Sequence, residues 1–103
     1  MAYQFALYEK KGRIAYVTIN RPDSMNALHP PANEELSEIW DDFQADDDLW
    51  VAIITGAGER AFCAGADLKF MANSGQSGAR TRENNGGFAG IDTRFDLWKP
   101  VIA

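Results

Sequence analysis

The sequence predicts an α/β fold whose sheet is mainly parallel after an opening antiparallel hairpin. Three observations support this class. Two strand-like segments near the start are joined by a short glycine-containing turn, which favours a hairpin. An amphipathic helical pattern follows, and after it comes a nearly all-apolar segment, which is typical of a parallel strand covered on both faces.

The first quarter of the chain contains the predicted hairpin. Residues Tyr3–Tyr8 alternate loosely and are rich in aromatic side chains, as expected for a half-buried strand. Residues Lys10–Gly12 form a predicted turn, and Arg13–Ile19 form the second strand. Turn-forming residues occupy Asn20–Ser24, and Met25–Leu28 follow as a loop.

The helix is predicted to begin at two consecutive prolines, because proline is tolerated in the first helical turn. Its apolar side chains lie at helical spacing and define one buried stripe. They are Leu36, Ile39, Trp40 and Phe43. Three acidic residues at 46–48 come next. Acids at a helix C-terminus would oppose the macrodipole, so we expect them in the following turn.

The second half begins with the predicted buried strand Leu49–Thr55 and a glycine turn. Small residues then lead into a helix expected to open near Ala66. The stretch 73–90 is polar and glycine-rich, so it is predicted as a surface loop that can also cover a ligand. Residues Ile91–Trp98 are predicted as helical turns, and Pro100 starts a last strand.

Composition limits the classes of function. The chain has 103 residues, 46% of them hydrophobic and 24% charged, which indicates one globular domain. A net charge of −5 argues against nucleic acid as a partner. The single cysteine, Cys63, cannot form an intrachain disulfide and favours a reducing compartment. With no apolar stretch of about 18 residues and no secretory signal, we expect a cytoplasmic protein that does not enter membranes.

The segment Ala64–Asp67 is the strongest candidate for a functional site. Small side chains at a helix start leave backbone N–H groups uncovered, and such groups bind negative charge. An enzyme that stabilises a developing oxyanion needs donors of this kind. A plain tight turn before a helix is the alternative, and this motif alone does not decide between the two.

Five segments together resemble the crotonase family, also called the enoyl-CoA hydratase/isomerase family. They occur in the family's order and span nearly the whole chain. The segments are Ile14–Pro22, Asn26–Leu28, Ala52–Gly56, Ala61–Leu68 and Trp98–Ala103. The resemblance implies a spiral fold of ββα repeats, in which residues 1–103 form an incomplete N-terminal portion. We therefore expect the chain to be interrupted within its last strand, and the apolar residues there have nothing after them to bury against.

The resemblance also implies roles for particular residues. The backbone N–H of Ala66 is expected to be one of two donors to a thioester carbonyl, and Gly65 is expected to let the substrate approach the backbone. Backbone groups of Ala27 and Ala64 are expected to contact the adenine of coenzyme A, with Leu68 packed on it. The structural alternative for this segment is that Asn26 caps a turn beside a core leucine. The predicted coenzyme A site comprises Ala27, Ala64, Gly65, Asp67, Leu68 and Lys69.

Several polar residues have both a functional and a structural interpretation. Arg21, Arg60 and Lys69 are candidates for pairing with coenzyme A phosphates, although for each one a solvated surface cation is favoured. Arg21 before Pro22 can also simply fix the turn. For Asp67 a carboxylate in a first helical turn is favoured over a catalytic acid, because the family's proton-transfer acids lie elsewhere.

Three further features are predicted to be structural. The sequence positions no acid or nucleophile partner beside His29, and the neighbours of Cys63 give no sign of a reactive thiol. The acidic cluster near residues 41–48 lacks the ligand pattern of a metal loop, so no metal site is predicted.

The reaction that the resemblance implies is hydration of a trans-2-enoyl-CoA through an enolate stabilised by the oxyanion hole. Enoyl-CoA isomerisation or other crotonase-type chemistry is the alternative, and a non-catalytic coenzyme A-binding or assembly module is a second hypothesis. No metal or redox cofactor is implied, since coenzyme A belongs to the substrate. A homo-oligomer, either a trimer or a dimer of trimers, is expected. Because the family's second donor and catalytic acids follow residue 103, we expect this chain alone to be inactive.

Overall fold

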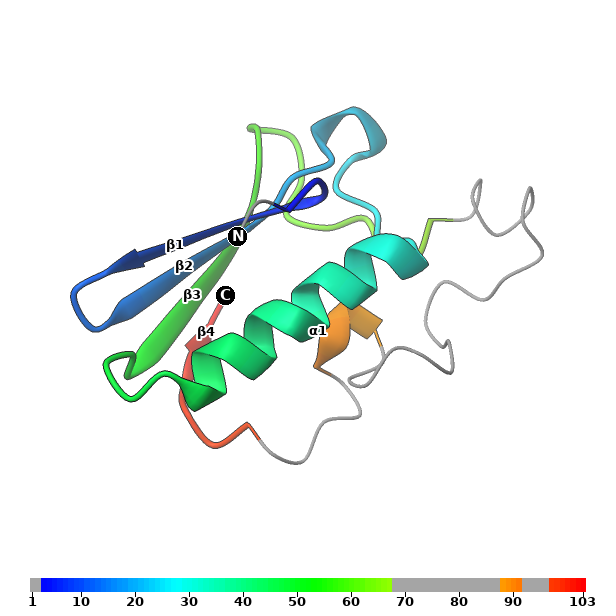
Figure 1. Ribbon diagram of the computed structural model, residues 1–103. Coiled ribbons are helices and arrows are strands. Elements are labelled where there is room, and N and C mark those ends of the chain that lie inside the picture. Colours follow the sequence, from blue (N-terminus) through cyan, green and yellow to red (C-terminus); the bar gives the residue numbers. More distant parts are fainter. Residues whose placement is uncertain (1–2, 68–87, 92–96) are drawn as a thin grey trace.

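The computed structural model describes residues 3–67, 88–91 and 97–103, and within them one helix lies across one face of a four-stranded sheet (Figure 1). The α/β class is therefore confirmed. The elements are β1 (Ala6–Lys11), β2 (Ile14–Ile19), the 3-10 helix η1 (Pro22–Ser24), α1 (Pro30–Ala45), β3 (Val51–Gly56), the 3-10 helix η2 (Phe88–Gly90) and β4 (Val101–Ile102).

The strands lie in the order β1-β2-β3-β4. The pair β1/β2 is antiparallel, whereas β2/β3 and β3/β4 are parallel, which confirms the predicted sheet. The first strand was predicted three residues too early. Lys11 pairs with Ile14, so the turn contains only Gly12 and Arg13. Two of the three residues assigned to the turn, Lys10 and Lys11, belong to β1. Gly12 adopts a φ of 60°, which favours glycine in a tight hairpin turn.

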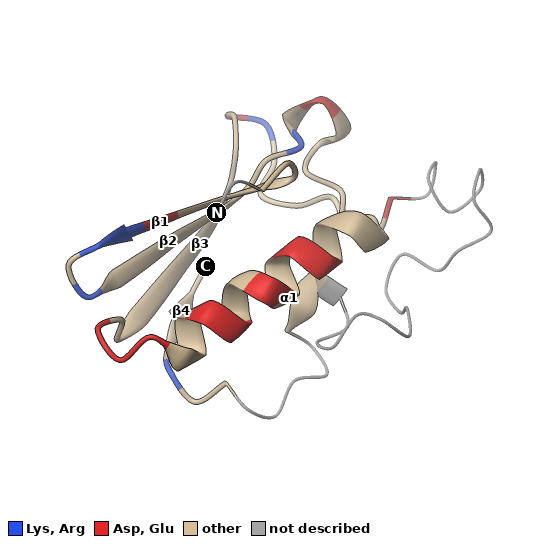
Figure 2. Cartoon of the chain, viewed as in Figure 1, with Lys and Arg blue, Asp and Glu red and all other residues tan. Residues whose placement is uncertain are grey.

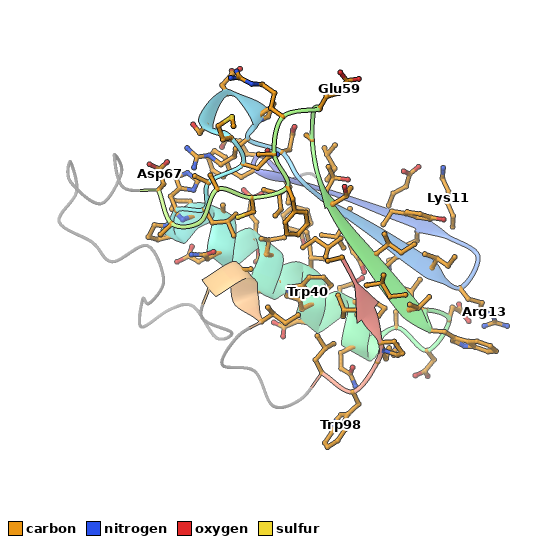
Figure 3. All side chains as sticks on the ribbon, turned by 180° about the vertical axis from the view of Figure 1, so that it is seen from behind. Lys11, Arg13, Trp40, Glu59, Asp67 and Trp98 are labelled. Atoms are coloured by element: carbon orange, nitrogen blue, oxygen red, sulfur yellow. The ribbon has the colours of Figure 1, made fainter. Side chains whose placement is uncertain are left out.

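The core lies between α1 and the sheet. The predicted helical stripe is confirmed, because Leu36, Ile39, Trp40 and Phe43 are all 0% exposed. The facing strands contribute the alternate residues Ala15, Val17, Ile19, Ala52 and Ile54. Acidic residues occur along α1 outside this stripe, which makes the helix amphipathic (Figure 2). The tryptophans differ in exposure: Trp40 is buried in this core, whereas Trp98 is largely exposed (Figure 3).

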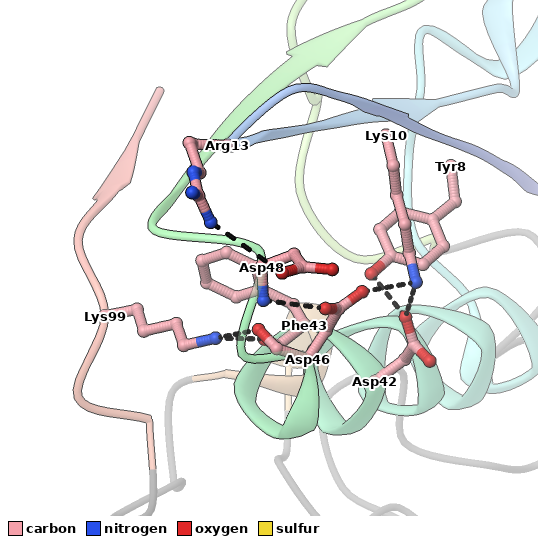
Figure 4. Close-up of polar contacts among 8 residues, drawn as sticks. All are labelled: Tyr8, Lys10, Arg13, Asp42, Phe43, Asp46, Asp48 and Lys99. Carbon is pink, nitrogen blue, oxygen red and sulfur yellow. Dashed lines mark hydrogen bonds and ion pairs between the residues drawn. The ribbon is translucent and has the colours of Figure 1, made fainter.

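Lys10 joins the edge strand β1 to the last turns of α1 (Figure 4). Its Nζ lies 2.8 Å from Asp42 Oδ2 and 2.9 Å from Asp46 Oδ2. The hydroxyl of Tyr8 donates to Asp42 Oδ2 over 2.7 Å. The hydrogen bonds from Lys10 and Tyr8 lower the pKa of Asp42, while burial and the hydrogen bond to Asp42 raise the pKa of Tyr8. The network therefore favours an ionised Asp42.

The C-terminus of α1 is capped by a side chain that comes from just before β4. Lys99 Nζ donates to the carbonyl oxygens of Phe43, over 2.8 Å, and of Asp46, over 2.5 Å (Figure 4). A cation there stabilises the negative end of the helix dipole. The acids at 46–48 lie after the last helical residue, as predicted.

Some predicted elements fall outside the described residues. Of the helix expected near Ala66, only Ala66 and Asp67 are described, and Ala66 forms an isolated β-bridge instead. The loop 73–90 is described only in its last three residues, which form η2. Most of the segment Ile91–Trp98 also lies outside the described residues. In the part that is described, no helix combines the length and the apolar character needed to cross a membrane.

Candidate functional site

The candidate site lies where β2 and β3 end. Because these strands are parallel, their carboxyl ends lie at the same edge of the sheet, beside the start of α1 (Figure 1). The segments 20–28 and 57–67 leave the sheet there and pack against each other. Crevices outside the carboxyl ends of parallel strands are the usual ligand sites of α/β proteins.

A single β-bridge between Leu28 and Ala66 fixes the predicted oxyanion donor. The Leu28 N–H donates to the carbonyl oxygen of Gly65, and the Asp67 N–H donates to that of Leu28, each over 2.8 Å. Parallel pairing of this kind uses the neighbours of Ala66, so the N–H of Ala66 points away from Leu28. Within residues 3–67, 88–91 and 97–103 this N–H has no hydrogen-bond acceptor. Ala66 is half-buried, and its amide is directed toward an acceptor that the described chain does not supply.

Gly65 permits this arrangement through its backbone. Its φ of 104° lies in a region that residues with a side chain rarely adopt. A Cβ at this position would meet no heavy atom within 4 Å. Glycine is therefore favoured at position 65 by the backbone conformation. Within the described chain, crowding around the position does not require it. The open space beside Gly65 also leaves room for a ligand to approach the backbone.

Asp67 and Arg21 form an ion pair that the sequence did not reveal. Arg21 Nη1 lies 2.8 Å from Asp67 Oδ2, and the two side chains are 16% and 12% exposed (Figure 3 labels Asp67). The same nitrogen donates to the Ala27 carbonyl oxygen over 2.6 Å. The interpretation of Arg21 as a solvated cation was wrong, and its pairing within the chain leaves it poorly placed to bind a phosphate. Only the opposite charges hinted at this pair, because 46 residues separate them.

Asn26 caps the turn at Arg21, as the structural alternative expected, and it also joins the two loops of the site, which sequence reasoning missed. Its side chain is 1% exposed and makes three hydrogen bonds. The Oδ1 atom accepts from the Arg21 N–H over 2.9 Å. The Nδ2 group donates to the carbonyl oxygens of Ala57, over 2.9 Å, and Ala61, over 2.8 Å. Asn26 therefore ties the loop after β2 to the loop after β3. The signal available in the sequence was an asparagine after a turn, a residue type that accepts the observed φ of 56°.

Close packing of these loops depends on Gly56. A Cβ there would lie 2.3 Å from the carbonyl oxygen of Phe62, 2.7 Å from that of Ala61 and 2.7 Å from Asn26 Nδ2. Residues of both loops line a partly open pocket of about 270 Å³. Its lining includes Pro22, Met25, Asn26, Gly58 and the exposed Arg60. None of the lining residues belongs to the predicted coenzyme A site, although Arg60 was a phosphate candidate.

His29 has a structural role, as predicted. It is the residue before α1, and its Nδ1 accepts from the Ala32 N–H over 3.3 Å. The ring packs edge-on against Phe5, with centroids 4.5 Å apart. Burial lowers the pKa of His29, and the nearby positive charge of Arg21 lowers it further. The other residue predicted to be structural, Cys63, is half-buried against the core.

The structure thus brings most of the predicted site residues together. Ala27, Ala64, Gly65, Ala66 and Asp67 lie on the two paired segments, and the Ala64 N–H donates to the Met25 carbonyl oxygen over 3.0 Å. Leu68 and Lys69 lie outside the described residues. Among the residues that the structure describes, no group of three or more His, Cys, Asp or Glu side chains is arranged to hold a metal ion.

The chain is similar to proteins of one family. Residues 9–103 match the sequence model described as Enoyl-CoA hydratase/isomerase. An (E)-benzylidenesuccinyl-CoA hydratase of Thauera aromatica is 41% identical over 95 residues, covering 92% of this chain and 36% of that protein. A carnitinyl-CoA dehydratase of Proteus mirabilis is 45% identical over 93 residues, covering 90% of this chain and 34% of that protein. The chain therefore spans about a third of the length of these curated relatives.

The chain is also similar to solved structures of CoA hydratases. The crystal structure of a carnitinyl-CoA hydratase from Mycobacterium avium superposes with a TM-score of 0.84 at 36% sequence identity. The match covers 97% of this chain and 38% of that one.

Proposed function

Because this chain belongs to the enoyl-CoA hydratase/isomerase family, we propose that the natural protein carrying it hydrates a trans-2-enoyl-CoA. The backbone N–H of Ala66 donates to the thioester carbonyl oxygen. Charge develops on that oxygen when an enolate forms, so a donor that is already oriented lowers the barrier to reaction. The adenine end of coenzyme A lies against Ala27, Ala64 and Leu68, and Lys69 lies near its phosphates.

The observation that carries this proposal is the direction of the Ala66 amide. Its neighbours use their polar groups to pair with Leu28, while its own N–H has no acceptor within the described residues. A backbone donor that is left without an acceptor costs free energy unless a ligand or water satisfies it. An anionic or strongly polarised oxygen satisfies it best.

The names of the relatives support the choice of reaction. One is named a hydratase and another a dehydratase, both of CoA thioesters. Hydration and dehydration are the same reaction in opposite directions, so both share the transition state that a carbonyl donor stabilises. Hydration is therefore preferred here over isomerisation.

The test replaces one atom. In the natural protein, the alanine at 66 is replaced by lactic acid, which converts the amide into an ester. This removes the N–H, keeps the side chain and weakens the Gly65 carbonyl oxygen as the acceptor for Leu28. Hydration of crotonyl-CoA is followed by the loss of absorbance of the conjugated thioester. We expect kcat to fall about 10²–10³-fold, the usual effect of losing one oxyanion donor.

Ala66→Gly is the matched control because it keeps the N–H, and we expect it to retain most of the activity. An ester variant as active as the unmodified protein would contradict the proposed role of Ala66.

The remaining parts of the proposal concern the whole protein. The second donor and the catalytic acids are supplied by residues outside this chain, so the 103-residue chain alone does not turn over crotonyl-CoA. The protein acts in the cytoplasm as a homo-oligomer and needs no metal or redox cofactor. Turnover of crotonyl-CoA by the purified 103-residue chain would contradict the first of these statements and would place the acid–base groups within residues 1–103.

A further inference from the structure

We propose that Arg21 is a positioning residue, whose guanidinium fixes the direction of the Ala66 N–H by joining Asp67 to Ala27. This inference rests on the proposed role of Ala66 as an oxyanion donor. Arg21 does not touch the substrate. It acts by holding the segment that presents the amide.

The hydrogen bonds of Arg21 and the Leu28–Ala66 bridge hold the chain on both sides of Ala66. The Arg21 Nη1 atom lies 2.8 Å from Asp67 Oδ2 and 2.6 Å from the Ala27 carbonyl oxygen. Ala27 precedes Leu28, and Asp67 follows Ala66, so the guanidinium bridges the two segments one residue away from the Leu28–Ala66 bridge. The segment before Ala66 is held by the bond from Leu28 to Gly65, and the segment after it is held by the backbone and side chain of Asp67.

Arg21 is itself well fixed. Its backbone N–H donates to Asn26 Oδ1 over 2.9 Å, and its guanidinium carbon lies 5.8 Å from the centre of the Phe5 ring. The side chain is 16% exposed, so water screens its ion pair less than it screens a surface pair. Arginine suits this role because its rigid planar group donates in several fixed directions, whereas lysine offers a compact charge on a flexible stem.

Stabilisation of an oxyanion depends on the direction of the Ala66 N–H. An oxyanion donor must lie about 2.7–3.1 Å from the position that the charged oxygen takes in the transition state. A displacement of about 1 Å can cost about 10²-fold in rate. An interaction that strengthens mainly in the transition state affects kcat rather than KM. Loss of the bridge is therefore expected to lower kcat while the substrate still binds.

The experiment uses the natural protein with Arg21→Gln, Arg21→Lys and Asp67→Asn. Two quantities are measured: kcat and KM for crotonyl-CoA, and the red shift of a bound aromatic enoyl-CoA thioester. That shift reports polarisation of the thioester carbonyl. We expect Arg21→Gln and Asp67→Asn to lower kcat about 10–100-fold, with KM changing less than about 3-fold, and to reduce the red shift. Arg21→Lys is expected to restore part of both.

Arg13→Gln is the matched control, since Arg13 is exposed and contacts Asp48 and Trp50, which precede β3. It should behave as the unmodified protein does. If Arg21→Gln unfolds the protein, Asp67→Asn removes the same ion pair with almost no change in size, and its circular dichroism confirms the fold.

The outcomes separate the two proposals. If the ester at 66 lowers kcat and the Arg21 and Asp67 variants leave kcat and the red shift unchanged, the positioning role is overturned and the function of Ala66 stands. A rise in KM at unchanged kcat also overturns the positioning role, because Arg21 then acts in binding. If the ester at 66 has no effect, both proposals fail.

Discussion

Replacement of Asn26 by alanine tests how the two loops of the site are held together. The substitution removes three hydrogen bonds, to the Arg21 N–H and to the carbonyl oxygens of Ala57 and Ala61, at a side chain that is 1% exposed. At about 1 kcal/mol each, these bonds contribute about 3 kcal/mol. Asparagine tolerates the left-handed φ of 56°, and alanine adds about 1 kcal/mol of strain there. We expect the free energy of unfolding to fall by about 4 kcal/mol in total.

The assay is equilibrium urea unfolding followed by circular dichroism, with the slope m compared between variants. Asn26→Gly is the matched control for the backbone, because glycine relieves the φ strain and loses the same bonds, so it should cost about 3 kcal/mol. Asn26→Asp keeps the shape of the side chain but places a carboxylate oxygen against the carbonyl oxygens of Ala57 and Ala61, which it repels. It should lower the free energy of unfolding at least as much as Asn26→Ala does. A loss below about 1 kcal/mol for Asn26→Ala would refute the reasoning, because three buried bonds cannot be worth so little.

Three further predictions concern stability. Gly56→Ala places a Cβ 2.3 Å from the Phe62 carbonyl oxygen, so we expect the urea midpoint to fall by the equivalent of about 2–3 kcal/mol, whereas Thr55→Ala, at an exposed position, should change it little. The pKa of Asp42 is lowered in the fold, so the stability that Lys10 contributes is present above the ordinary carboxyl range and is lost as the pH falls through the lowered value. The difference in urea midpoint between the unmodified chain and Lys10→Met should therefore shrink at acid pH, and a constant difference would contradict the pairing. The pKa of His29 is also lowered in the fold, so protonation of His29 opposes folding, and stability should fall as the pH drops below about 6.5. His29→Asn keeps an acceptor for the Ala32 N–H, and it should abolish this part of the pH dependence of the urea midpoint.

The strands and the helix could be predicted because each depends on local pattern. The spacing of Leu36, Ile39, Trp40 and Phe43 identified the buried face of α1, and the apolar run of β3 identified a strand inside a parallel sheet. The boundaries of β1 were predicted three residues too early, although the two-residue turn at Gly12 and Arg13 was a usable signal.

The connections of the site could not be predicted in the same way. The pairing of Arg21 with Asp67 depends on the approach of two loops, and ten basic and fifteen acidic residues offer many other combinations. The three bonds of Asn26 likewise reach carbonyl oxygens that only the folded chain brings near. The resemblance singled out two segments that the fold brings together, but it did not reveal which side chains hold them.

The bridge between Leu28 and Ala66 has one more consequence. Leu28 is a fully buried member of the hydrophobic interior, and its backbone is the direct neighbour of the amide proposed to act on the substrate. A change that repacks the interior around Leu28 therefore moves that amide as well. Selection for turnover should restrict this leucine as strictly as it restricts residues in contact with the substrate.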